Sequence, residues 1–162
     1  MSADTSQEDP LLLACRELGR QMDLFDDAAA RALGIGRNDL RALNLLEPGP
    51  LSAATIADRL HLTRAGVTAL IDRLEADHLV ARTTEPTDRR VVLVELQPPT
   101  WTAFATIYRP LGRQVQAATA HLEADQRETL TDALNSLVTA FGASRSHLAS
   151  APAGKVASTA TV

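Results

Sequence analysis

The residues of this sequence whose side chains could do specific chemistry gather in one short segment. Thr63, Arg64 and Thr68 place two hydroxyls and a forked guanidinium within six residues, and Ala65 between them is small enough to permit close approach. Hydroxyl and guanidinium groups near the start of a helix are donors and acceptors that bind the base edges and phosphates of duplex DNA. The segment therefore predicts a nucleic-acid contact surface.

Charged residues downstream could extend this surface. Arg73 could reach a phosphate, or it could pair with Asp77 four residues later on the same helix. Asp88 precedes Arg90 by two residues, so its carboxylate could hold that guanidinium extended towards a narrow minor groove, while Arg89 points to the other face. On their own, the two adjacent arginines could also be a solvated turn.

Two helices are predicted to position the first group. Ser52 is a suitable N-cap for a helix over residues 53–60, and Thr63 for another over 64–77. Residues 61–63 alone separate them. The second helix has an apolar face made of Val67, Leu70, Ile71 and Leu74. This is a helix-turn-helix layout in which Arg64 and Thr68 point away from the core.

A β-hairpin is predicted to follow. Residues 80–84 and 90–96 are rich in β-branched side chains, and the charged segment 85–89 joins them. A hairpin after a helix-turn-helix is a wing, which reaches the DNA backbone or minor groove next to the recognition helix.

Longer helices flank this lobe. Residues 9–33 have an apolar period of three and four and end at Gly34, and a short helix follows, capped by Asn38 or Asp39. A helix from Pro98 to about residue 121 contains Pro110, which predicts a kink or break near Arg109. The last helix, 125–148, has an apolar stripe made of Leu130, Leu134, Leu137, Val138 and Phe141. The fold is predicted to be mainly α.

Composition also limits the classes of protein to which the chain could belong. The 162 residues are 45% hydrophobic, enough to bury a core, and apolar stretches are far shorter than the ~20 residues that span a bilayer. The acidic N-terminus lacks the features of a signal peptide, so we expect a cytoplasmic protein. One cysteine and four histidines without metal-ligating spacing predict no metal and no cofactor, and no catalytic motif is present, so we expect no enzyme.

The net charge of −4 mildly opposes nucleic-acid binding, because proteins that bind phosphates usually have a basic surface. However, residues 58–90 hold six arginines and six acidic residues, so this segment is neutral and the excess of negative charge lies in the rest of the chain. In combination, several motifs resemble the MarR family (multiple antibiotic resistance regulators) over roughly residues 11–148. These motifs are Leu33-Gly34-Ile35, Pro48-Gly49-Pro50-Leu51-Ser52, Ile56-Ala57-Asp58-Arg59-Leu60, Val67-Thr68-Ala69-Leu70-Ile71-Asp72-Arg73-Leu74-Glu75, Leu79-Val80-Ala81-Arg82 and Asp88-Arg89-Arg90.

The resemblance implies one winged helix-turn-helix domain over 1–162, with a DNA-binding lobe at 37–97 and long N- and C-terminal dimerisation helices at 9–34 and 98–148. Residues 1–8 and 149–162 are expected to be disordered. It implies that Thr63, Arg64, Thr68 and Arg73 contact groove and backbone, and that Asp88 supports Arg90 at the wing. A homodimer would bind a pseudo-palindromic operator in double-stranded DNA, as a repressor released by a small-molecule effector that the sequence does not identify.

The chain departs from the family pattern at His61 and His78, where glycine is usual, and at Leu96-Gln97, where Leu-Thr is usual. Two alternatives stay open: a winged-helix dimer that binds a protein partner, and a thiol switch at Cys15, against which a buried core cysteine is the favoured interpretation. Trp101, Phe104 and Tyr108 share a helical face that favours core or dimer contact over a ligand site.

Overall fold

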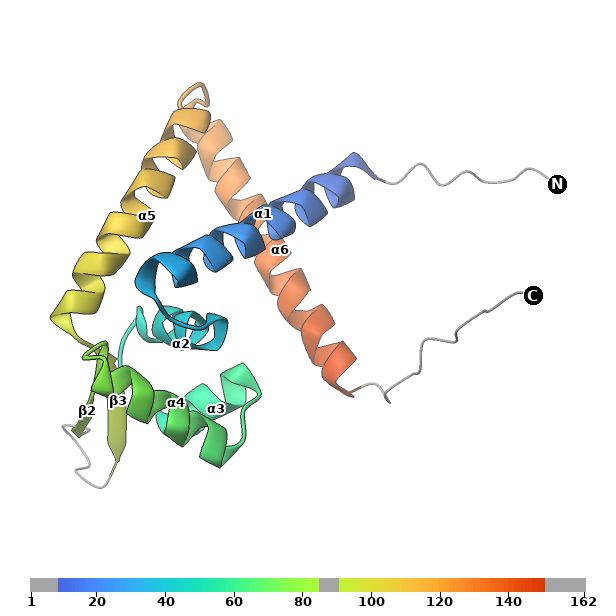
Figure 1. Cartoon of the computed structure of the whole chain (residues 1–162). Coiled ribbons are helices and arrows are strands. Elements are labelled where there is room, and N and C mark those ends of the chain that lie inside the picture. Colours follow the sequence, from blue (N-terminus) through green and yellow to red (C-terminus); the bar gives the residue numbers. More distant parts are fainter. Residues whose placement is uncertain (1–8, 85–90, 151–162) are drawn as a thin grey trace, which may run out of the picture. The chain divides into compact units, whose positions relative to one another are not determined.

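The computed structural model describes residues 9–84 and 91–150, with side chains to residue 148 (Figure 1). Its contacts divide the chain into two units that meet between Leu111 and Gly112, and each is treated by itself. The described elements are α1 (Pro10–Leu33), α2 (Arg37–Leu46), β1 (Leu51–Ser52), α3 (Ala53–Leu60), α4 (Arg64–Ala76), β2 (Val80–Thr84), β3 (Val92–Leu96), α5 (Pro98–Ala118) and α6 (Ala124–Ser150). The predicted mainly helical winged helix-turn-helix is confirmed.

The first two helices begin and end at local signals. The Asp9 carboxylate accepts a hydrogen bond from the Leu11 N–H at 2.9 Å, and Gly34 closes α1 in the left-handed conformation with φ 69°. Helix α2 starts at Arg37, two residues before the start that an N-cap at Asn38 would give. Gly36 is its N-cap. Asp39, the third residue of the helix, reaches back with its carboxylate, which accepts a hydrogen bond from the Gly36 N–H at 3.1 Å. The prediction that Asn38 or Asp39 is the N-cap is therefore wrong.

The two helices of the central motif form as predicted. The Ser52 hydroxyl accepts from the Thr55 N–H at 3.1 Å and starts α3. The Thr63 hydroxyl accepts from the Gly66 N–H at 3.1 Å and starts α4. Each cap replaces a hydrogen bond that the first helical turn cannot make internally, and together the two caps fix the short turn between the helices.

A three-stranded antiparallel sheet follows, in the order β1-β3-β2. Arg82 on β2 and Leu51 on β1 both pair with Val94 on β3, so β3 is the central strand. The hairpin of β2 and β3 is as predicted, although the predicted strand start at Arg90 lies outside the described residues. The two-residue strand β1 was not predicted, because it is too short to show a period.

The core of the first unit lies between α2, α3, α4 and the sheet. Leu40, Leu43 and Ile56 are fully buried, and each stabilises the fold by about 1.5–3 kcal/mol. Thr100 at the start of α5 is also buried, and its hydroxyl donates to the Leu79 carbonyl at 2.6 Å. This bond ties the start of α5 to the short connection between α4 and β2.

An aromatic contact joins α1 to α5. The ring centroid of Tyr108 lies 5.5 Å from Phe25 and 5.4 Å from Phe104, in the tilted geometries that aromatic pairs prefer. Phe104 is buried, as predicted for a core residue, whereas Trp101 is 45% exposed. The predicted break near Arg109 is absent, because α5 continues through Pro110 to Ala118. Pro110 only removes one backbone donor from this helix.

Helix α6 dominates the second unit. Its start is held by the Glu123 N–H, which donates to the Gln126 side chain at 3.0 Å, and by Arg127, which donates to the Thr119 carbonyl at 2.8 Å. The predicted bounds of 125–148 differ from the observed ones by one and two residues. In the described parts of the chain, no helix is long and apolar enough to cross a membrane.

Candidate nucleic-acid interface

Helix α4 has one buried face and one exposed face, as its sequence predicts. Its apolar residues are at most 3% exposed: Val67, Leu70, Ile71 and Leu74. Thr63, Arg64, Ala65 and Thr68 are all on the exposed face. These four predicted contact residues, at the N-cap and in the first half of α4, are therefore all exposed in the structure.

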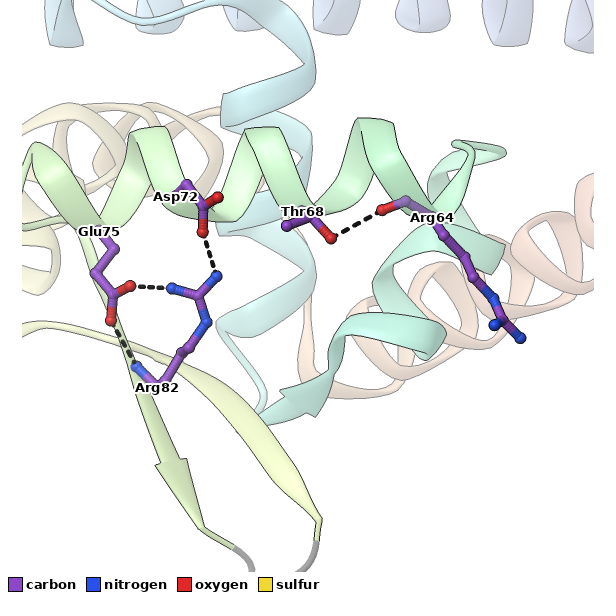
Figure 2. A network of polar contacts seen from close by, with 5 residues as sticks. All are labelled: Arg64, Thr68, Asp72, Glu75 and Arg82. Carbon is purple, nitrogen blue, oxygen red and sulfur yellow. Dashed lines mark hydrogen bonds and ion pairs between the residues drawn. The ribbon is translucent and has the colours of Figure 1, made fainter.

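The hydroxyl of Thr68 is oriented by its own helix. It donates to the Arg64 carbonyl at 2.9 Å, one turn earlier (Figure 2). Because the hydrogen is used inside the helix, the oxygen lone pairs remain to accept from a donor in a groove, such as the amino group of adenine or cytosine. The side chain of Arg64 extends away from this bond, and the structure shows no carboxylate partner for it among the described residues (Figure 2).

The turn between α3 and α4 has a left-handed residue where the family pattern has glycine. His61 has φ 55° and ends α3, with its N–H donated to the Ala57 and Asp58 carbonyls. His78, just after α4, has φ 57°. Both histidines therefore adopt the left-handed conformation that glycine adopts most readily, at the cost that this conformation imposes on a side chain. His61 is therefore the C-cap of α3.

Arg73 bonds to a buried carboxylate of the lobe, although its own side chain is 53% exposed. Its Nη2 donates to Asp39 Oδ1 at 2.5 Å and its Nε donates to Oδ2 at 3.3 Å. Asp39 is only 5% exposed, and its hydrogen bonds raise the pKa of Arg73 above the usual value. The alternative of a pair with Asp77 is not the bonded one, because the hydrogen-bonded carboxylate comes from α2, 34 residues away. Asp77 adds only a coulombic attraction that raises the pKa of Arg73 further. The ion pair braces α4 against the start of α2.

A second ion-pair network joins α4 to the wing. Arg82 on β2 donates from Nη2 to Asp72 at 2.5 Å and from Nη1 to Glu75 (Figure 2). Its backbone N–H also donates to Glu75 at 3.3 Å. The bond with Asp72 does most to raise the pKa of Arg82. Sequence reasoning gave none of these three residues a role, although Asp72 precedes Glu75 by three residues, so both carboxylates share one side of α4.

The structure says less about the remaining predicted functional residues, which are three residues of the wing and Cys15. Asp88, Arg89 and Arg90 lie outside the described residues, between strands whose ends, Thr84 and Val92, pair with each other. Cys15 is partly buried on α1 and is not part of the buried core, so the interpretation as a buried core cysteine is wrong for the chain by itself.

An open hollow of about 620 Å³ lies along α3 and the turn to α4. Arg59, His61 and Arg64 are among its lining residues, together with Asp58. The hollow therefore adjoins the exposed face of α4 and adds two further cationic or titratable side chains to it.

Comparison with known proteins agrees with this geometry. Residues 33–91, from the end of α1 to the wing, match the family model described as MarR family. An uncharacterized HTH-type transcriptional regulator of Bacillus subtilis, YcgE, is 39% identical over 98 residues, which are 60% of this chain and 64% of that protein. The chain thus spans just under two thirds of this relative.

Solved structures share the fold. A mutant of MepR from S. aureus superimposes with a TM-score of 0.67 at 18% identity, covering 83% of this chain and 99% of that one. Another S. aureus MepR mutant, solved bound to an oligodeoxyribonucleotide, gives a TM-score of 0.54 at 19% identity, covering 83% and 99%. Residues 33–91, which include α4, thus match the MarR family, and the resemblance inferred from the sequence is confirmed for this segment.

Proposed function

We propose that this protein is a dimeric transcriptional regulator that binds double-stranded DNA with sequence specificity. The observation that carries the proposal is the exposed face of α4, where Arg64 and Thr68 offer hydrogen bonds and Ala65 permits close approach. This face lies in the segment that matches the MarR family, and a protein of the same fold is known bound to an oligodeoxyribonucleotide. In the proposed complex, α4 enters the major groove and the wing contacts the adjacent backbone.

The roles of the contact residues follow from their positions. Arg64 would read a base edge or a phosphate, and Thr68 would accept a hydrogen bond from a base. Arg89 and Arg90 would contact the backbone or minor groove, with Asp88 supporting Arg90. Arg73 would act mainly through its brace with Asp39, because a guanidinium bonded twice to a carboxylate has fewer donors left for a phosphate.

Dimerisation would supply the second recognition helix. Helices α1 and α6 each expose large apolar side chains, which include Met22 (61%) on α1 and Val138 (71%) on α6. Such stripes favour burial against a second copy of the chain. Two recognition helices about 34 Å apart would then read a pseudo-palindromic operator. By resemblance, we extend the proposal to repression of transcription in the cytoplasm, released by a small-molecule effector.

Selection of bound duplexes from a randomised DNA pool tests the proposal, followed by titration of the recovered duplex at several salt concentrations. We expect a two-fold-symmetric sequence and an affinity that falls steeply with salt, because phosphate binding releases counterions. No enrichment from a folded, dimeric protein would reject it.

The net charge of −4 keeps a second function in view, a winged-helix dimer that binds a basic protein partner. The same titration separates the two functions. A protein-binding module would show no measurable affinity for duplex DNA at low salt, where non-specific binding is strongest.

A further inference from the structure

Two acidic residues of α4, Asp72 and Glu75, lie on the side that the proposed function turns towards DNA. Asp72 follows Thr68 by four residues and Ala65 by seven, so the three share one side of α4. The side chain of Asp72 is 59% exposed. Figure 2 shows Thr68, Asp72 and Glu75 along this side of the helix. A helix that approaches phosphates with two carboxylates on that side would be repelled.

A single cation forms ion pairs with both carboxylates. Arg82 reaches across from β2 and bonds to Asp72 and Glu75 together, and its side chain is 35% exposed. Arg73, which lies on α4 next to Asp72, bonds instead to Asp39 on α2. Among the described residues, Arg82 is therefore the cation bonded to these two carboxylates.

We propose that Arg82 is a positioning residue that masks the charge of Asp72 and Glu75, so that the C-terminal half of α4 can approach the DNA backbone. This inference rests on the proposed function. The guanidinium acts through the carboxylates, and its own contact with phosphate is not required. Because the same bonds tie β2 to α4, the masking charge stays in place when the wing and the helix meet DNA together.

The test compares the affinities of full-length variants for the selected duplex and for a mixed-sequence duplex of equal length. Arg82→Ala is expected to weaken binding to both by roughly three- to tenfold at moderate salt, because two carboxylates are exposed to phosphates. The triple variant Arg82→Ala/Asp72→Asn/Glu75→Gln is expected to return to within about twofold of the wild type. It lacks the ion pairs as well, so a purely structural role of Arg82 would leave it as weak as Arg82→Ala.

A matched control removes one negative charge from α4 outside the network. Arg82→Ala/Asp77→Asn should bind as weakly as Arg82→Ala, because Asp77 caps the helix end and is not bonded to Arg82. Recovery in this control equal to that of the triple variant would show an effect of net charge alone and would overturn the proposal. Thermal unfolding checks that each variant is folded.

A second variant keeps the proposal testable if Arg82→Ala does not fold. Asp72→Asn/Glu75→Gln leaves Arg82 without its partners, so binding to the mixed-sequence duplex should tighten by about two- to fivefold and depend more steeply on salt. Weaker binding by this variant would overturn the proposal, as would an unrescued triple variant. If the wild type binds neither duplex, the proposed function itself has failed, which separates the two failures.

Discussion

Three arginines on or beside α4 differ in what holds them. Arg73 bonds to the buried Asp39 and Arg82 to a pair of carboxylates on α4, whereas the structure shows no carboxylate partner for Arg64 among the residues it describes. Spacing along the sequence cannot distinguish these cases, because the partner of Arg73 lies on another helix. The distinction makes Arg64 the arginine of α4 most available to read a base.

Replacing Arg64 tests this assignment. Arg64→Ala should weaken binding to the selected duplex by about 1–3 kcal/mol and relax base preference at one position of each half-site, because a forked donor is lost from the groove. Fluorescence anisotropy with the selected duplex and its single-base variants measures both effects. Arg41→Ala, an exposed arginine on α2, is the control and should bind as the wild type does. A loss for Arg64→Ala that is equal for all sequences would assign Arg64 to the backbone.

Tyr108 is the only tyrosine of the chain, so it reports on its surroundings without interference. Burial raises the pKa of its hydroxyl above the ordinary value of about 10. The ultraviolet absorbance of the phenolate should therefore appear at higher pH in the folded protein than in urea. Since the folded pKa is the higher one, Tyr108 stabilises the fold below about pH 10, and this contribution is lost as pH rises through the folded pKa.

The comparison with Tyr108→Phe isolates this effect from other groups that titrate in the same range. The difference in unfolding free energy between wild type and variant should start to change as the pH passes the unfolded pKa and stop changing above the folded pKa. A phenolate that titrates at the same pH in both states would mean that the hydroxyl is not buried in solution.

At the scale of elements, the sequence predicts most of the lobe because its signals are local. Ser52 and Thr63 cap helices within three residues, and the hairpin strands show their composition directly. The missed features depend on distant partners. Strand β1 exists only because Leu51 pairs with Val94, and the cap of α2 is Gly36 because the carboxylate of Asp39 reaches back.

The left-handed turn after α3 offers a test of stability at this scale. His61→Gly should stabilise the protein by up to about 1 kcal/mol, because removing the Cβ relieves about 1–2 kcal/mol while the more flexible unfolded chain offsets part of it. Urea unfolding measures the change. His61→Ala keeps the Cβ and should give no such gain. If alanine stabilises as much as glycine, the φ of residue 61 is not the cause.

For the whole molecule, the sequence predicts which helices carry apolar stripes, but a single chain does not bury them. On α1, Leu12, Leu18 and Met22 are more than half exposed, and on α6 Val138 and Phe141 are more than 60% exposed. In the described chain, large apolar side chains are thus buried in the lobe and exposed along α1 and α6.

Substitutions on α6 test whether a second copy covers its stripe. Leu134→Glu places a charge on the stripe and should convert a dimer to monomers in sedimentation at micromolar concentration, because an unpaired charge is costly to bury in an apolar interface. Ser136→Glu, two residues further on and facing a different side of the helix, is the matched control and should leave the dimer intact. DNA affinity should fall steeply only for Leu134→Glu, since one recognition helix must then bind alone. A wild-type protein that sediments as a monomer at these concentrations would contradict the dimer directly, and equal sedimentation of both variants would place the interface on another face.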